Sequence, residues 1–489
     1  MKNRLIKLFS LLLVIIMSLT TLVACPTPED EAKISTDVYE GDVIWVGNTA
    51  GTTGALASIG VPFNLGINAA FAEYNSNGGF NGKTVALKHY DDKGVATNSV
   101  SMMEKLIHED EVFAIVGNYG GYALNVNLDI LKENCVPMIY AAAGIDALYN
   151  DNATTDGDRC IFPVQPLNKT EGQSLLVRAF ANAVAADGTT LTGGLGATKV
   201  GVIANQDEAS QGILNGVKLE AEKLPASKKS NIVYQEVAGS DYGAAATALV
   251  SAGCDTVIVT VTGEANFVAA LTALAQANFT GNVLTSYNNS DAGVLNDDSN
   301  KLTEAGLEIL SKMTIYAQGW LDVTSTEYVY NKDTALFRTY KMQSSAQYGN
   351  GVVGFTESYW NVAEAIFEYA YTVDKGTAWA MSYNSYALAG YIAGNLFCQA
   401  LEEMEKAGME LTRANLVEIM ETVELQVAMA ETISYANGAR TGVEKFSAAV
   451  FFDTSDEALG ENATKDPAAA SAPFVGLQTI EQLRNYITE

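Results

Sequence analysis

Few side chains in this chain of 489 residues have the types and spacing that catalysis or metal binding requires. There are two histidines, His89 and His108, and neither is placed at an evident strand end beside a nucleophile. The sequence contains no G-x-S-x-G and no H-E-x-x-H pattern, the marks of serine hydrolases and zinc proteases. We therefore expect no catalytic residue, no metal ion and no cofactor.

The cysteines also give no metal or redox motif. Cys135, Cys160, Cys254 and Cys398 lie far apart, with no C-x-x-C spacing among them. Each sits among apolar residues, where a cysteine usually acts as a small buried side chain. A disulfide between Cys135 and Cys160 stays possible if the protein is exported.

The overall charge excludes one class of partner. The chain has 29 Lys and Arg against 57 Asp and Glu, a formal net charge of −28, with 48% hydrophobic residues and nine prolines. Such a composition is that of a folded globular protein. Because an acidic surface repels phosphate backbones, we expect no nucleic-acid binding.

The N-terminal residues 1–24 have the pattern of a secretory signal peptide. A basic start precedes an apolar stretch of about 12 residues, short of the ~20 that a spanning helix needs. The stretch ends in Leu-Val-Ala-Cys, which resembles a bacterial lipobox with Cys25 as the lipidated residue. Residues 25–41 would then be a tether from the outer face of the cell membrane. An ordinary signal peptide with an incidental cysteine is the alternative.

From residue 42 onward, short apolar runs typical of strands alternate with helical patterns. In the first set of such segments, one helix face is indicated by the apolar residues Val100, Met103 and Ile107. In the second set, a helix face is indicated by Phe267 and Leu271. The expected strands are 43–46, 85–88, 113–116, 136–140, 200–204, 232–234, 256–260 and 283–285. This alternation predicts an α/β fold with parallel sheets, each covered by helices on both faces.

Later segments carry other patterns. Residues 186–198 indicate a loop within the second set, and the polar segment 286–298 indicates a return crossing to the first lobe. Long helices are expected over 357–370, 386–406 and 412–423. A strand-like run lies within 438–453, and we assign no structure to the residues that follow it.

Five features in fixed order carry a family resemblance. They are residues 48–54 (NTAGTTG), 74–83 (YNSNGGFNGK), 89–92 (HYDD), 114–117 (AIVG) and 136–140 (VPMIY). Together they resemble the type I periplasmic solute-binding proteins of ABC importers, the leucine/isoleucine/valine-binding family. The resemblance implies two α/β lobes, joined by several chain crossings, that close on a small solute.

The resemblance and the strand pattern together divide the chain. Residues 42–163 are expected to begin the first lobe and 164–288 the second. Residues 289–410 would return to the first lobe with a helical insertion, and 411–489 would form a C-terminal segment of the second lobe with a tail.

The expected ligand site lies beyond the carboxyl ends of the strands, where glycine lets the backbone approach a ligand. Glycine-bearing loops follow three of these ends, at 47–54, 117–121 and 141–144. Their other interpretation is plain turn chemistry. The candidate ligand-binding residues are Thr49, Thr53, Asn118, Tyr119, Gly120, Gly121, Ala142, Gly144, Gln206, Glu264, Tyr287 and Trp320.

The nature of the solute stays open. The resemblance places the serine, threonine and acid of amino-acid-binding members at Gly121, Gly144 and Tyr287, and all three differ. Glu264 could replace the acid, or it could simply be an acidic first-turn residue of a helix. Aromatic and amide residues expected nearby suit a polar, partly flat solute. The further members of this group are Tyr122, Asn288 and Gln318.

Three functions compete at this point. The first is a monomeric lipoprotein that delivers a small solute, an amino acid or a related compound, to an ABC permease. The second is a ligand-sensing lipoprotein with a signalling partner. The third is an extracytoplasmic hydrolase, for which the sequence offers no nucleophile with an activating base.

Overall fold

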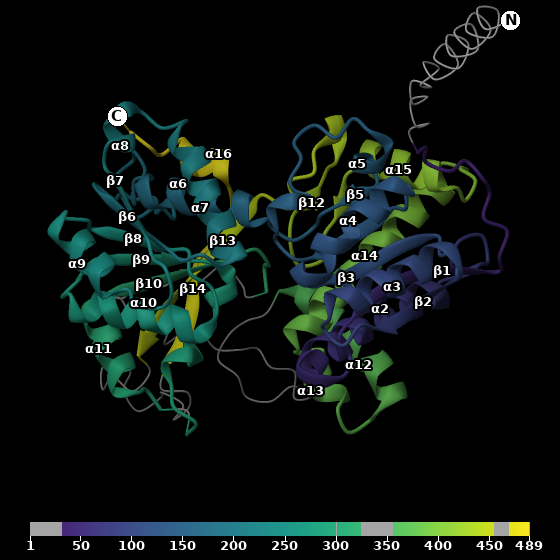
Figure 1. Cartoon of the computed structure of the whole chain (residues 1–489), viewed down its shortest axis with the longest axis horizontal. Helices are drawn as coiled ribbons and strands as arrows, with labels where there is room; N and C mark the ends of the chain where they lie inside the picture. Colours follow the sequence, from purple (N-terminus) through teal and green to yellow (C-terminus); the bar gives the residue numbers. More distant parts are fainter. Residues whose placement is uncertain (1–31, 300, 324–355, 454–468, 489) are drawn as a thin grey trace, which may run out of the picture.

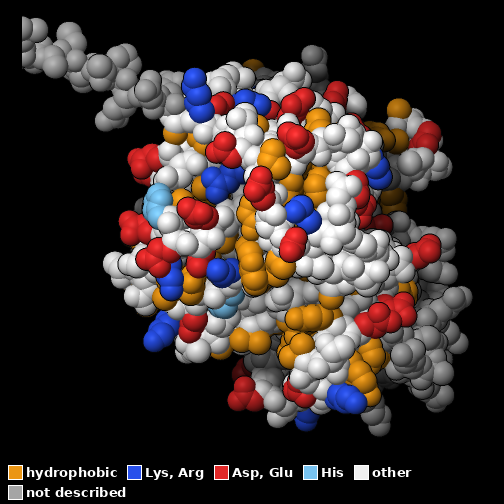
Figure 2. Space-filling model, turned by 90° about the vertical axis from the view of Figure 1, so that its right-hand side faces the viewer, with side chains coloured by type: hydrophobic (Ala, Val, Ile, Leu, Met, Phe, Trp, Pro, Cys, Tyr) orange, Lys and Arg blue, Asp and Glu red, His pale blue; other side chains and the backbone are white. Residues whose placement is uncertain are grey.

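The computed structural model describes residues 32–299, 301–323, 356–453 and 469–488, which form two lobes side by side (Figure 1). The expected signal peptide and Cys25 lie outside these residues. Within the described part of the chain, no helix is both long and apolar enough to cross a bilayer. The outer side of the first lobe shows acidic and basic side chains interspersed with apolar ones (Figure 2).

The first lobe is built on a parallel sheet of five strands in the order β2-β1-β3-β4-β5. Helices α2 and α14 pack on one face of this sheet, and helices α3 and α4 pack on the other. The strands are β1 (Val43–Ala50), β2 (Thr84–Asp91), β3 (Ala114–Tyr119), β4 (Met138–Ala142) and β5 (Ile161–Phe162). The helices are η1 (Gly54–Leu56), α2 (Ala57–Ser76), α3 (Ala96–His108), α4 (Gly121–Glu133), η2 (Asp146–Leu148), α5 (Asp156–Arg159), α12 (Glu357–Val373), α13 (Ala378–Ser382), α14 (Ser385–Lys406), α15 (Arg413–Thr422) and η6 (Ala436–Gly438).

The second lobe contains a seven-stranded sheet in the order β14-β13-β10-β9-β8-β6-β7. Helices α6 and α7 pack on one face, and α9, α10 and α11 pack on the other. The strands are β6 (Val200–Ala204), β7 (Ile232–Glu236), β8 (Thr256–Val259), β9 (Asn282–Thr285), β10 (Thr314–Gly319), β13 (Lys445–Asp453) and β14 (Ala469–Thr479). The helices are α6 (Asn168–Phe180), α7 (Glu208–Ala221), α8 (Ala226–Lys229), α9 (Gly243–Ser251), α10 (Glu264–Gln276), η3 (Tyr287–Asn289), η4 (Ala292–Leu295), α11 (Glu304–Lys312) and α16 (Ile480–Arg484).

The α/β fold with two lobes is confirmed, and the second sheet adds a feature that the sequence did not indicate. Strand β13 pairs antiparallel with β10, and β14 pairs antiparallel with β13. The sheet is therefore mixed, with a parallel body and two antiparallel strands at one edge. The C-terminal residues without an assigned structure supply β14 and α16.

The predicted return to the first lobe at residue 289 is wrong. Strand β10 pairs with β9 in the second sheet, and η4 packs in the apolar core of that lobe. The segment 286–298 is polar because several of its side chains are exposed, among them Asn288, Ser290 and Asp291, and not because it crosses between lobes. The crossing to the first lobe comes after Gly319.

The C-terminal segment also divides differently from the prediction. Helix α15 and the small hairpin β11 (Leu425–Gln426) and β12 (Thr432–Ile433) contribute apolar residues to the core of the first lobe. The chain enters the second lobe only at β13 (Figure 1). The lobes are thus joined at residues 163–167, after Gly319 and at 439–444, which agrees with the expected hinge of several crossings.

The segment expected as a free tether is partly docked on the first lobe. The Tyr39 N–H donates to Leu411 O at 2.8 Å, and the Tyr39 ring packs edge-on against Phe113 with centroids 5.6 Å apart. The Ala414 N–H donates to Ser35 O at 3.0 Å. The polar composition of this segment concealed the two apolar residues, Ile34 and Tyr39, that pack against the core.

The four cysteines of the described residues are free and buried, so the considered bridge between Cys135 and Cys160 is absent from this structure. Their buried positions agree with the interpretation as small apolar side chains.

Candidate ligand-binding site

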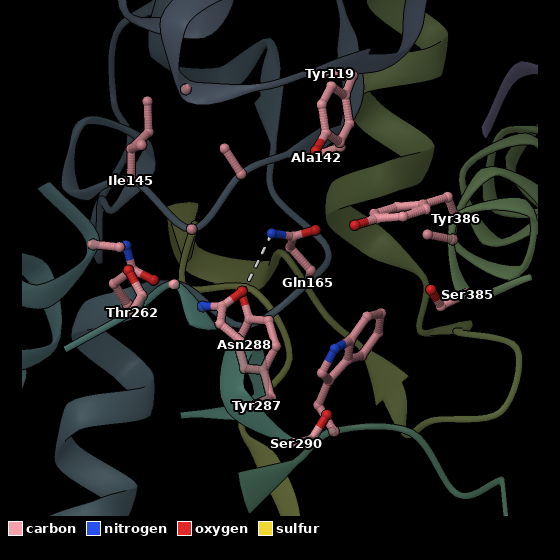
Figure 3. Close-up of a pocket in the computed structure, with 18 of the residues that line it drawn as sticks. Tyr119, Ala142, Ile145, Gln165, Thr262, Tyr287, Asn288, Ser290, Ser385 and Tyr386 are labelled. Atoms are coloured by element: carbon pink, nitrogen blue, oxygen red, sulfur yellow. Dashed lines mark hydrogen bonds between the residues drawn. The ribbon is translucent and has the colours of Figure 1, made fainter. Parts of the chain in front are cut away.

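A cavity of about 1130 Å³ lies between the lobes and is lined by residues of both. The strands that reach it do so with their carboxyl ends, as the fold type predicts. Its volume is slightly above the ~300–1,000 Å³ of small-molecule sites, which suits an open cleft. Figure 3 shows residues from both lobes, with Tyr119, Ile145 and Tyr386 from the first and Thr262, Tyr287 and Asn288 from the second.

One wall is a group of four aromatic residues from the first lobe. The Phe63 ring lies 5.8 Å from the Tyr119 ring and 6.3 Å from the Tyr140 ring, centroid to centroid. Tyr119 in turn meets Tyr386, from the first turn of α14, edge-on at 6.5 Å. Tyr140 has no exposed surface, and its hydroxyl has no hydrogen-bond partner among the described residues. Burial raises the pKa of the Tyr119 hydroxyl to about 12, so this wall is uncharged at neutral pH.

The floor of the cavity lies where the chain crosses between the lobes. The Tyr287 hydroxyl donates to Pro166 O at 3.3 Å and accepts from Gln165 Nε2 at 3.5 Å (Figure 3). Trp320 follows β10 at the next crossing, and 9% of its surface is exposed. Gln165 and Trp320 belong to the hinge, and Tyr287 is hydrogen-bonded to it, so movement of one lobe against the other would change their positions.

A buried carboxylate holds the loop that carries Tyr287. Glu171 lies on α6, has no exposed surface and accepts hydrogen bonds from Tyr287 N at 2.8 Å and Ser286 Oγ at 2.9 Å. Burial raises the pKa of this carboxyl to about 7, although the two hydrogen bonds oppose the shift. Glu171 thereby fixes the position of two cavity residues, Tyr287 and Asn288, without lining the cavity itself.

The opposite wall belongs to the second lobe and carries three carboxylates. Asp207 caps α7 through Oδ1, which accepts from Ser210 N at 2.7 Å. Asp291 caps η4 in the same way, accepting from Gly293 N at 2.8 Å. Glu208 follows Asp207 in the first turn of α7. Of the described residues that line the cavity, none is Lys, Arg or His.

Six of the twelve candidate residues line the cavity, and the strand-end rule accounts for most of them. Tyr119 ends β3 and Gly121 follows it, Ala142 ends β4 and Gly144 follows it, and the remaining two lie after β9 and β10. The six are Tyr119, Gly121, Ala142, Gly144, Tyr287 and Trp320. Asn288, from the wider group, also lines it.

Three candidates are instead used to join elements of the first lobe. The Asn118 Oδ1 atom accepts from Thr49 N at 2.9 Å and Thr49 Oγ1 at 3.0 Å, and both residues are fully buried. They connect β1 to β3 beneath the cavity. Thr53 is exposed and donates its hydroxyl to Asp91, away from the cavity lining.

Three more candidates fall outside the lining for other reasons. Gly120 is the N-cap of α4 with φ of 95°, a backbone conformation that favours glycine. Gln206 is exposed, and its neighbour Asp207 takes the cavity position. Glu264 is an exposed first-turn acid of α10, which was the alternative interpretation. Tyr122 and Gln318 also lie outside, with the Tyr122 hydroxyl donating to Asp92 Oδ1 at 2.8 Å.

Several lining residues escaped the sequence analysis. Asp207 and Thr262 follow β6 and β8, so the strand-end rule could have found them. Gln165 lies in the first crossing and Asn168 begins α6, whereas Ser385 and Tyr386 begin a helix more than 200 residues further along. No local pattern marks these four. Among the described residues, no group of His, Cys, Asp or Glu has an arrangement that could hold a metal ion.

Solved structures share this architecture at low sequence identity. An extracellular ligand-binding receptor from Verminephrobacter eiseniae is 19% identical, with a TM-score of 0.56, covering 83% of this chain and 97% of that one. A leucine-binding protein from Thermotoga maritima is 17% identical, with a TM-score of 0.52, covering 88% and 97%. A solute-binding protein of R. palustris, solved with benzoate, is 14% identical, with a TM-score of 0.51, covering 90% and 99%. These likenesses show the fold.

Curated relatives match over shorter stretches. A Leu/Ile/Val-binding protein homolog of Brucella abortus is 33% identical over 96 residues, 20% of this chain and 26% of that protein. An amino acid binding protein of Pseudomonas aeruginosa is 25% identical over 224 residues, 44% of this chain and 53% of that protein. The match thus spans at most about half the length of either relative.

The family model for periplasmic binding proteins matches residues 43–325, more than half of the chain. This stretch begins at β1 and includes most of both sheets and the cavity residues that follow their strands. The family consists of extracytoplasmic solute-binding proteins and not of enzymes. The chain is a member of the type I periplasmic binding proteins, the family that includes the leucine/isoleucine/valine-binding proteins.

Proposed function

We propose that this protein is the extracytoplasmic solute-binding component of an ABC importer and that it closes its lobes on a small organic solute. The observation that carries the proposal is the cavity itself, which both lobes line and which two of the three crossings border. A solute that touches both walls favours the closed form by its higher affinity for that form. A permease could then distinguish the loaded protein by its shape.

The names of related proteins support an amino acid or a related compound as the solute class. The Brucella and Pseudomonas relatives are named for amino-acid binding, and the R. palustris neighbour was solved with benzoate. Solutes of this size fit the volume between the walls. We propose that the protein binds one such solute as a monomer.

We further propose that the protein is exported and held at the outer face of the cell membrane by a lipidated Cys25. The docked segment supports a short connection, because residues 34–39 already contact the first lobe. A Cys25→Ser variant should leave the membrane fraction and appear in the soluble exported fraction. Retention of this variant in the membrane fraction would contradict the anchor but not the binding function.

The binding function is tested by thermal unfolding against a panel of amino acids, amines, amides, aromatic acids, sugars and nucleosides. A solute that binds only the folded state stabilises it by mass action and should therefore raise Tm. The free energy of unfolding increases by about 2.7 kcal/mol when the solute concentration is 100 times Kd. X-ray scattering with the same solute should show a smaller radius of gyration. If no compound raises Tm and the scattering stays constant throughout, the proposal fails.

A matched pair of variants localises the binding. Ala142 lines the cavity, and Ala142→Trp should fill part of it and abolish the Tm increase. Ala226 begins the short helix α8 on the exposed surface, outside the lining, and Ala226→Trp should respond to the solute like the unaltered protein. An equal response of both variants would place the binding elsewhere.

A further inference from the structure

Glu208 of the second lobe reaches across the cleft to the first residues of α4 in the first lobe. Asn125 Nδ2 donates to Glu208 Oε1 at 2.9 Å and to Oε2 at 3.2 Å. A methyl group placed on Gly121 would lie 3.4 Å from Glu208 Oε2. That distance is an ordinary van der Waals contact, so the Glu208 carboxylate lies directly beside the first residue of α4.

The place that Glu208 occupies is where an anionic solute group would otherwise bind. Helix α4 has 13 residues, and its first N–H groups give this end a partial positive charge that favours a carboxylate. Glu208 provides that carboxylate from within the chain, and Asn125 adds two hydrogen bonds to it. A solute carboxylate would have to displace this contact.

The rest of the cavity offers no second place where a solute carboxylate could bind. Within the described part of the chain, Asp207 and Asp291 accept hydrogen bonds from their own lobe only, and no ion pair neutralises either. The lining described above contains no basic side chain. A second anion in this space would be repelled by three carboxylates, whereas a cation would be attracted by them.

The opposite wall also suits a cation with an apolar body. The faces of aromatic rings attract ammonium groups electrostatically. Phe63, Tyr119, Tyr140 and Tyr386 form one connected aromatic group on this wall. Tyr140 has no exposed surface, so the tyrosine rings that a solute can reach on this wall are those of Tyr119 and Tyr386.

We infer that the solute is an organic cation without a carboxylate: an amine with an apolar or aromatic body that packs between the tyrosines and the carboxylates of Asp207 and Asp291. Glu208 supplies the negative group that would otherwise belong to the solute. This inference rests on the proposed function, because it takes the cavity to be the binding site.

The test compares molecules that share a body and differ in charge. One set is 3-methylbutylamine, L-leucine and 4-methylpentanoate, and the other is tyramine, L-tyrosine and 3-(4-hydroxyphenyl)propanoate. Calorimetry or thermal unfolding should show the amine of at least one set binding at least about tenfold more tightly than its zwitterion and its acid. If neither amine binds more tightly than its zwitterion and its acid, the inference is overturned, while binding of a zwitterion or an acid still supports the proposed function.

Two variants test the assigned groups. Glu208→Ala should open the end of α4 and reduce the preference for the amine over the zwitterion by about tenfold. Glu304 is likewise a first-turn acid of a helix in the second lobe, but it lies outside the lining, and Glu304→Ala should keep the preference. Asp207→Asn should weaken amine binding about tenfold and preserve Tm, since asparagine also caps helices well. An unchanged preference in Glu208→Ala would overturn the role of Glu208.

The results separate the two proposals. If the broad panel identifies a neutral or anionic solute and every amine fails, the charge inference is overturned and the binding function stands. If no compound of any class binds, both fail.

Discussion

The backbone N–H of Tyr287 donates to the buried carboxylate of Glu171 at 2.8 Å, so a residue of the cavity floor is held by a charge that lies outside the cavity. The same carboxylate accepts from Ser286 Oγ, which in turn accepts from Asn288 N at 3.1 Å. The contact joins α6, the first element after the first crossing, to the loop after β9. It therefore connects the hinge to the position of two lining residues.

The raised pKa of Glu171 makes stability depend on pH. Burial raises this pKa from 4.5 to about 7, so the folded state binds the proton more tightly than the unfolded state does. Stability should therefore fall as pH rises from about 4.5 to 7, by at most about 3 kcal/mol from this group. Glu171→Gln should abolish this part of the decrease in stability with rising pH. At pH 8 the variant should therefore be more stable than the unaltered protein. Urea unfolding at pH 5 and pH 8 measures both effects.

The control for this prediction is an acid with no such burial. Glu304→Gln changes an exposed carboxylate of the same lobe and should leave the pH dependence as it was. Equal pH profiles for Glu171→Gln and the unaltered protein would show that Glu171 is not the group responsible.

The aromatic residues of the cavity should separate into ligand contacts and core residues. Tyr386 is 37% exposed, so Tyr386→Ala should weaken solute binding about tenfold and lower Tm little. Trp320 is 9% exposed and belongs to the core of the first lobe, so Trp320→Ala should cost about 3–5 kcal/mol of stability as well. Calorimetry and unfolding of the ligand-free variants measure the two effects.

Tyr371 provides the comparison for Tyr386. It is 46% exposed on α12 of the same lobe and does not line the cavity. Tyr371→Ala should keep both affinity and Tm. A loss of affinity in Tyr371→Ala equal to that in Tyr386→Ala would argue against the cavity as the binding site.

The fold was largely predictable because most strands of the two parallel regions contain a short apolar run, as β3, β4, β6 and β8 do. Residues 200–204 were expected as a strand, and β6 spans Val200–Ala204. The three later helices were also predicted, since their capping residues are local signals. Thr412, for example, accepts from Asn415 N at 3.0 Å at the start of α15. The crossing positions were not predictable, because the strand pairing of β10 with β9 depends on residues far apart in sequence.

The site was predictable only in part, for a related reason. A strand end places a residue at the correct edge of the sheet, but its side chain can point beneath the cavity, as those of Thr49 and Asn118 do. Tyr386 and Gln165 reach the cavity through the packing of α14 and the route of a crossing. Neither leaves a pattern in the neighbouring residues.

A charged network near the third crossing should be important for stability. Arg440 is 1% exposed in its side chain and pairs through Nη2 with Glu421 Oε1 at 2.6 Å, while Arg159 Nη2 meets Glu421 Oε2 at 2.7 Å. Glu421→Ala would leave the Arg440 charge buried with no carboxylate partner in this network, at a cost of about 3–5 kcal/mol. Glu418→Ala removes an exposed acid from the same helix and should cost less than about 0.5 kcal/mol. Urea unfolding at pH 7 distinguishes the two.

The packing of α14 on α2 gives the last prediction. A methyl group on Gly390 would lie 1.9 Å from Phe63 O, and one on Gly66 would lie 1.9 Å from Ala387 O, so the two helices touch backbone to backbone. Gly390→Ala must push α14 away, which should cost more than the ~1–3 kcal/mol typical of overpacking because no flexible side chain can move aside. Because Ser385, Tyr386 and Ala389 of α14 line the cavity, the same variant should also lose solute affinity.

The control for this substitution is Gly376→Ala, where the added methyl would meet only Asp374 Oδ1, at 3.4 Å. It should bind solute normally and unfold within about 1 kcal/mol of the unaltered protein. If Gly390→Ala were as stable as Gly376→Ala and bound solute as well, the close contact between α2 and α14 would not be what positions the aromatic wall. The position of Tyr386 would then depend on the hydrogen bonds at the N-terminus of α14, where Asn384 Oδ1 accepts from Tyr386 N at 2.9 Å.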